Sequence, residues 1–188
     1  MRIKPLIVFV LMIVMGLSIA GIIGGGYYPI AIVNGSLVLH RDFRTAYRGA
    51  TTYYGNTRIF ADEKGNPFAM PKGIEAEILN TLVEQTLIHV ALQKELGKDL
   101  ARTVQNRMRG VDSDEEFKKA AITLSGLRFE EFRSVELVPQ AERDILTGRF
   151  FLEGKKFDEW LLEAKRTGDV KIFSRAYFWD GGEVKGRE

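Results

Sequence analysis

The side chains that could perform chemistry in this 188-residue chain are few and lie far apart in the sequence. There are two histidines, His40 and His89, and no cysteine. A catalytic metal site or an activated nucleophile needs several such groups close together. The sequence also lacks the nucleophile-elbow, phosphate-loop, zinc-protease and dinucleotide-binding fingerprints. We therefore expect no catalysis, no cofactor and no metal site.

Two acidic segments have a functional and a structural interpretation. Asp62 to Asn66 lacks the alternating oxygen ligands of a calcium loop, so a solvated turn in a hairpin-like excursion over Arg58–Met70 is expected. Glu130 and Glu131 stand at a predicted helix start, where the helix dipole favours negative charge. We expect both segments to be structural rather than catalytic.

The basic residues do not predict nucleic-acid binding. Arg102, Arg107 and Arg109 lie on a predicted helix without supporting aromatic residues. The whole chain has 27 basic and 25 acidic residues, and without Arg2 and Lys4 the two numbers are equal at 25. The excess positive charge therefore belongs to the N-terminus, and the arginines are expected to form a solvated face.

Residues 5–23 form an uncharged run of 19 residues, PLIVFVLMIVMGLSIAGII, that follows Arg2 and Lys4. As a helix the run would measure about 28 Å, close to the hydrocarbon thickness of a bilayer. Its basic flank predicts a cytoplasmic N-terminus. We expect a single-pass anchor in the inner, or cytoplasmic, membrane and an extracytoplasmic (periplasmic) domain.

A cleaved signal peptide and a buried soluble helix are the alternatives for this run. Ser18 and Ala20 are small residues at the positions that a cut before Gly21 would need. The run is longer than the usual apolar region of about 7–15 residues in secretory signals, which favours a retained anchor. The expected organisation is an anchor over 1–24, a linker over 25–30, one domain over 31–180 and a polar tail over 181–188.

Apolar periodicity predicts a mainly α-helical domain with short β segments at both ends, preceded by the one transmembrane helix. Short strands are expected around the Asn34-Gly35 turn and over Val170–Trp179, and we hypothesise that they pair and close the domain. Gly73–Leu96 is the predicted central helix, with His89 a partly buried polar residue on it. Further helices are expected over 41–54, which Gly55-Asn56 would end, over 98–109, and after a capping box at Ser113–Glu116. The remaining helices are expected over 129–152, with a kink or restart at Pro139, and over 157–166.

Three stretches resemble the N-terminal domain of the SurA/PpiD/PrsA-type chaperones. They are Ile32–Val38 with Arg41-Asp42-Phe43, the helix Leu79–Gly97, and Leu124–Phe132, which reads LSGLRFEEF. The resemblance covers roughly residues 32–179. It implies a helical domain that binds unfolded or newly exported polypeptides. Many members add a parvulin prolyl-isomerase domain of about a hundred residues, but only 34 residues follow Gly154, so isomerase activity is not implied.

An aromatic-rich region is the predicted peptide-binding surface, because exposed apolar area marks interaction sites. Its members are Tyr47, Tyr53, Tyr54, Phe60, Phe68 and Met70. Ordinary core and loop packing is the alternative for each of them. The alternative function is an envelope assembly or scaffold subunit that binds one folded partner.

Overall fold

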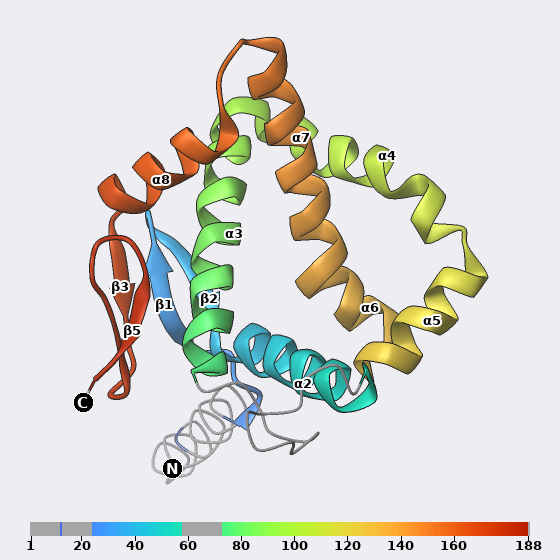
Figure 1. Cartoon of the computed structure of the whole chain (residues 1–188), viewed down its shortest axis with the longest axis horizontal. Coiled ribbons are helices and arrows are strands. Elements are labelled where there is room, and N and C mark those ends of the chain that lie inside the picture. Colours follow the sequence, from blue (N-terminus) through green and yellow to red (C-terminus); the bar gives the residue numbers. More distant parts are fainter. Residues whose placement is uncertain (1–11, 13–23, 58–72, 188) are drawn as a thin grey trace, which may run out of the picture.

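The computed structural model describes residue 12, residues 24–57 and residues 73–187, and over these residues the chain is mainly helical with short strands (Figure 1). The predicted anchor over 5–23, apart from Met12, and the predicted excursion over 58–70 lie outside the described residues. Within the described part of the chain, no helix has both the length and the apolarity needed to cross a membrane.

The elements follow one another in a strand–helix–strand order. They are β1 (Pro29–Val33), β2 (Ser36–Leu39), α2 (His40–Thr57), α3 (Ile74–Leu96), a 3-10 turn (Gly97–Asp99), α4 (Leu100–Asp112), α5 (Glu115–Ser125), α6 (Phe129–Phe132), a π-helical turn (Arg133–Leu137), α7 (Val138–Leu152), α8 (Phe157–Thr167), β3 (Val170–Ile172), β4 (Tyr177–Trp179) and β5 (Val184–Gly186).

The two ends of the domain pair in one small sheet, as the sequence predicts. β1 pairs antiparallel with β2 across a tight turn, in which Asn34 and Gly35 adopt the positive φ angles of 48° and 83° that such turns require. The other edge of β1 pairs antiparallel with β3. The Asn34 amide donates to the Asp169 carbonyl at 2.8 Å, and the Asp169 amide donates to Asn34 Oδ1 at 2.9 Å. The hypothesis that the terminal β segments close the domain is confirmed.

Residues 181–187, the described part of the expected polar tail, contain strand β5, which pairs with β4. Asp180 Oδ1 accepts from the amides of Gly182 and Glu183 and so forms the turn between the two strands. Val184 is buried, and its amide donates to Asn80 Oδ1 of α3 at 3.2 Å. The last strand is thus attached to the central helix.

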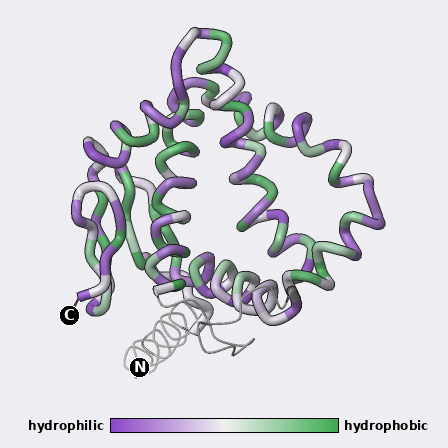
Figure 2. Tube along the Cα trace, in the orientation of Figure 1, coloured by the Kyte–Doolittle hydropathy of each residue, from purple (hydrophilic) through white to green (hydrophobic). Residues whose placement is uncertain are grey.

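Helix α3 is the centre of the core, as its wide apolar surface predicts. Hydrophobic positions recur along its whole length (Figure 2). Leu79 and Val83 pack into a cluster with the sheet and α2, whereas Ile88 and Leu92 pack into a second cluster with α4, α7 and α8. Both clusters contain side chains that are fully buried.

Two expected helix boundaries are wrong. Helix α2 continues through Gly55 to Thr57, and the Asn56 side-chain amide donates to the carbonyls of Thr123 and Leu124 at the end of α5. The N-cap of α5 is Asp114, which accepts from the Phe117 amide at 2.9 Å, rather than Ser113. The Ser113 hydroxyl instead donates to carbonyls in the last turn of α4.

The predicted kink at Pro139 is a π-helical turn that joins α6 to α7. Proline has no amide hydrogen for the carbonyl four residues earlier. That carbonyl belongs to Val135 and accepts from Gln85 Nε2 of α3 at 3.4 Å. Leu152 ends α7 and is 85% exposed, because the chain turns away through Gly154 directly after it.

Candidate functional site

Helix α2 crosses the lower ends of α3 and of the α6–α7 helix (Figure 1). A cleft of about 200 Å³ lies between residues of these three elements. One wall is made by Ala46 and Ala50, which are four residues apart and therefore share one face of α2. The facing wall and the end of the cleft are apolar too and consist of Ile74, Ile78 and Leu82 of α3, Val135 of the π-helical turn and Tyr54 of α2. Because the side chains of Ala46 and Ala50 are small, they leave a space, and the larger side chains of the other walls surround it.

The polar groups that line the cleft are acidic or neutral. Thr81 and Gln85 already donate to backbone carbonyls, those of Glu77 and Val135. Glu77 and Glu136 contribute carboxylates, and the described lining contains no lysine or arginine. Glu136 is an exposed residue of this lining, and partial desolvation of its carboxyl group raises its pKa.

Three of the six residues of the predicted aromatic-rich region lie within the described part of the chain, and all three are on α2. Tyr47 and Tyr54 both pack against the first core cluster. Tyr54 also lines the cleft, and Tyr47 stacks with Phe43 at 6.3 Å between ring centroids. Tyr53 is 43% exposed and meets Tyr54 edge-on at 6.2 Å. Phe60, Phe68 and Met70 lie outside the described residues.

Most of the cleft leaves no trace in the sequence, because alanines and core residues carry no functional signal of their own. Ala46 and Ala50 look like ordinary helix residues, and Ile74, Ile78 and Leu82 look like core. Only the crossing of α2 over α3 turns them into two facing walls. The sequence contains one indication of where the cleft lies. Tyr54 and Ile74 are close to the two ends of the 58–72 segment, and both line the cleft.

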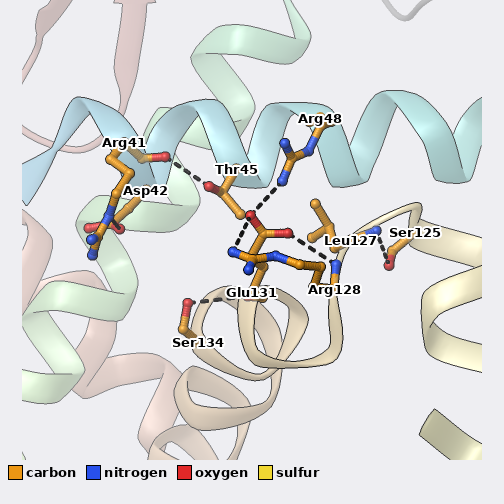
Figure 3. A network of polar contacts seen from close by, with 9 residues as sticks. All are labelled: Arg41, Asp42, Thr45, Arg48, Ser125, Leu127, Arg128, Glu131 and Ser134. Atoms are coloured by element: carbon orange, nitrogen blue, oxygen red, sulfur yellow. Dashed lines mark hydrogen bonds and ion pairs between the residues drawn. The ribbon is translucent and has the colours of Figure 1, made fainter. Parts of the chain in front are cut away.

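The crossing itself is fixed by the residues of the LSGLRFEEF stretch (Figure 3). Leu127 is 1% exposed and packs against Gly49 of α2, where a β-carbon would lie 2.9 Å from Leu127 Cδ1. The buried Ser125 hydroxyl donates to the Ala121 carbonyl and accepts from the Leu127 amide. Gly126 has the positive φ of 65° that ends α5 and lies against Thr52 of α2. This stretch therefore holds α2 in position.

Glu131 completes the same contact from the start of α6. Its carboxylate accepts from the Arg128 amide at 3.0 Å and pairs with Arg48 of α2 at 2.8 Å (Figure 3). These interactions lower the pKa of Glu131 to about 2, and the hydrogen bond from the Arg128 amide makes the largest contribution. The expectation that Glu131 is a structural carboxylate agrees with these contacts. Its neighbour Glu130 is exposed.

His89 has a partner that the sequence did not predict. Its Nδ1 lies 2.9 Å from Oε1 of Glu142 on α7, and Glu142 is 5% exposed while the His89 side chain is half exposed. The hydrogen bond to Glu142 raises the pKa of His89. The pair borders a cavity of about 560 Å³ between α3, α4 and α7. The two residues are 53 positions apart, so no local pattern could have joined them.

His40 has the opposite environment at the start of α2. Its ring stacks on Tyr28 at 4.7 Å between centroids, and its buried Nδ1 has no hydrogen-bond partner among the described residues. Burial, followed by the charge of Arg44, lowers the pKa of His40. The two histidines lie at different ends of the core.

The arginines of α4 are engaged with surface partners. Arg102 pairs with Asp99 at 2.7 Å, Arg107 pairs with Asp144 at 3.0 Å, and Arg109 donates to Asn106. All three are exposed, which agrees with the expected solvated face. Asp62 to Asn66, the other acidic segment, lies outside the described residues, and no group of three potential metal ligands occurs within them.

Comparison with known proteins gives no relative: no family model, no curated protein and no solved structure matches this chain.

Proposed function

We propose that this chain is a membrane-anchored extracytoplasmic chaperone-like protein that binds unfolded or newly exported polypeptides and performs no catalysis. Residues 5–23 are the anchor in this proposal, and residues 31–180 resemble the helical domain of SurA-type chaperones. The support for membrane attachment is the length and apolarity of the run and its basic flank. The support for polypeptide binding is the cleft.

The observation that carries the proposal is the chemistry of the cleft walls. Apolar side chains from α2, α3 and the π-helical turn surround a space that is smaller than the roughly 300–1,000 Å³ of pockets for drug-sized ligands. Such a space suits single apolar side chains of a polypeptide rather than a cofactor. The space also requires only that the client residue be apolar. A protein that binds many unfolded clients needs such a site.

The carboxylates of the cleft select among clients. Glu77 and Glu136 place negative charge beside the apolar walls, and the described lining has no compensating base. A client segment with an apolar residue next to lysine or arginine would satisfy both features. We therefore expect Leu- or Phe-containing peptides flanked by lysine to bind more tightly than the same peptides flanked by glutamate, with a difference that salt reduces.

The direct test is suppression of client aggregation. The full chain, reconstituted in phospholipid nanodiscs, is mixed with a chemically unfolded client, and light scattering is followed after dilution. We expect suppression at near-stoichiometric amounts for several unrelated clients. If none of these clients is protected, the chaperone proposal is wrong.

A second candidate function is an envelope scaffold subunit with one folded partner. Phe151 and Leu152, at the end of α7, are 81% and 85% exposed, and an exposed apolar pair is typical of a contact surface. Photocrosslinking in cells separates the two functions. A crosslinker at position 50, in the cleft, should give many products for a chaperone, whereas one at position 152 should give a single dominant product for a scaffold.

A further inference from the structure

The N-terminal half of α2 carries a basic surface that the proposed client binding does not use. Arg41, Arg44 and Arg48 are spaced by three and four residues and therefore share one side of the helix. Together with Thr45, Thr51 and the rings of Phe43 and Tyr47 they line a pocket of about 480 Å³. The cleft that contains Ala46 and Ala50 lies on another side of α2, so the two surfaces are separate.

The positive charge of this pocket is only partly neutralised. Glu131 is the one acidic residue in the described lining, and it is already held by the Arg128 amide and by Arg48 (Figure 3). Arg41 lies 3.4 Å from Asp42. Arg44 is exposed and forms no ion pair with any described residue. The pocket therefore presents guanidinium groups to a ligand, and guanidinium groups match phosphate in geometry and charge.

The same surface includes two aromatic residues that lie within the expected linker. Tyr27 is 53% exposed and Tyr28 37% exposed. The Arg41 guanidinium lies over the Tyr27 ring, 4.8 Å from its centroid, and donates to the Tyr27 hydroxyl at 3.1 Å. Exposed tyrosine next to arginine is the combination that proteins place at the level of lipid headgroups.

Chain connectivity decides where this pocket can be. Gly25 is part of its lining, and Gly25 is only two residues beyond the end of the apolar run at Ile23. Two residues span at most about 7 Å when fully extended. If the run crosses the bilayer, the side of the pocket that Gly25 lines lies within the headgroup region, since the chain has no length to carry it further away.

We propose that the pocket lined by Arg41, Arg44 and Arg48 binds the headgroups of anionic phospholipids and thereby fixes the domain against the membrane surface. This inference rests on the proposed membrane anchor but not on client binding. A fixed orientation would present the cleft between α2 and α3 at a constant height above the bilayer, close to polypeptides that emerge from the membrane.

The test uses the full chain in nanodiscs of phosphatidylcholine alone or of phosphatidylcholine mixed with phosphatidylglycerol. The chain has no cysteine, so a single engineered cysteine takes one dye. Thr51→Cys places the dye at the pocket, and Gly154→Cys places it at the turn between α7 and α8. Energy transfer to a headgroup-labelled lipid reports how close each site lies to the bilayer.

We expect the Thr51→Cys signal to rise when phosphatidylglycerol is present and the Gly154→Cys signal to stay lower. Added to the Thr51→Cys chain, Arg44→Glu should reduce the docked-to-undocked ratio at least about fivefold, the factor that corresponds to ~1 kcal/mol per basic side chain near an anionic surface. Arg109→Glu is the matched control, because it makes the same charge change at an exposed position of α4. It should leave the ratio unchanged.

The possible outcomes distinguish a failure of headgroup binding from a failure of the proposed membrane anchor. If the chain does not co-elute with nanodiscs, the anchor is wrong. If it co-elutes but the Thr51→Cys signal is equal in both lipids, or falls equally in both arginine variants, headgroup binding is overturned while the anchor stands. Sodium phosphate should displace the domain no more than sodium chloride of equal ionic strength; stronger displacement would assign the pocket to free phosphate instead of lipid.

Discussion

Leu127 Cδ1 packs so closely against Gly49 that a β-carbon at Gly49 would lie 2.9 Å from it. Leu127 precedes α6 and Gly49 is in the middle of α2, so this contact sets the distance at which α2 crosses the helical hairpin of α5 and α6. The same crossing positions one wall of the apolar cleft. A single glycine therefore connects the packing of the domain to its candidate binding site.

Gly49→Ala should destabilise the protein by about 1–3 kcal/mol, the usual cost of overpacking a buried contact. Gly55→Ala in the same helix is the control, since a β-carbon there meets no atom within 4 Å of the described structure. It should be neutral or stabilise by up to about 1 kcal/mol, because alanine is the better helix former. Chemical unfolding of both variants measures the difference. Equal destabilisation of the two would contradict the close-contact interpretation.

Glu131→Gln should lower stability at neutral pH by about 1 kcal/mol, because the charge-assisted bonds to the Arg128 amide and Arg48 are lost. The folded-state pKa of Glu131, about 2, lies below its ordinary value, so the carboxylate stabilises the fold above about pH 4.5 and this contribution disappears as the pH falls toward 2. Unfolding midpoints at pH 7 and at pH 3 measure the difference in stability between wild type and variant. This difference should be smaller at pH 3. Glu130→Gln at the exposed neighbouring position should show little effect at either pH.

The two histidines should titrate on opposite sides of their ordinary pKa. Nuclear magnetic resonance can follow each of them separately, because the chain has only two. We expect the pKa of His89 above 6.5, because Glu142 favours its charged form, and the pKa of His40 below 6.5, because burial disfavours its charged form.

The raised pKa of His89 also has a consequence for stability. A raised folded-state pKa means that the stabilisation is complete below about pH 6.5 and is lost as the pH rises through the folded value. His89→Gln should remove this alkaline loss, since glutamine can donate to Glu142 at any pH. Free energies of unfolding at pH 6 and pH 9 test this; an unchanged pH dependence in the variant would show that the His89–Glu142 contact does not form in solution.

Ala50→Leu should fill the cleft and weaken client binding about tenfold, which corresponds to ~1.4 kcal/mol. Its matched control is Ala120→Leu, the same substitution at an exposed position of α5. Peptide affinity and light scattering should change only in the first variant, while thermal unfolding confirms that both remain folded. Retained client affinity in a folded Ala50→Leu variant would place client binding outside the cleft.

Local sequence patterns determined the helices, the Asn34-Gly35 turn and the central place of α3. These features depend on the spacing of apolar residues and on backbone conformations that few residues accept, so they are written in neighbouring positions. The same patterns predicted the α5 cap one residue too early, and they could not show that Leu152 would be exposed. A residue between two helices can bond to the last turn of the first helix or to the first turn of the second. Whether a residue at a helix end is exposed depends on where the chain turns next.

Tertiary structure alone decided which distant residues meet. The His89–Glu142 pair, the attachment of β5 to Asn80, and the facing of Ala46 and Ala50 toward Ile78 and Leu82 all join residues separated by many positions in the sequence. Small and aliphatic side chains carry no functional signal until a helix crossing turns them into the walls of one space. The physical reason is that the cleft exists between elements, and the distance between them is set by contacts such as that of Leu127 with Gly49.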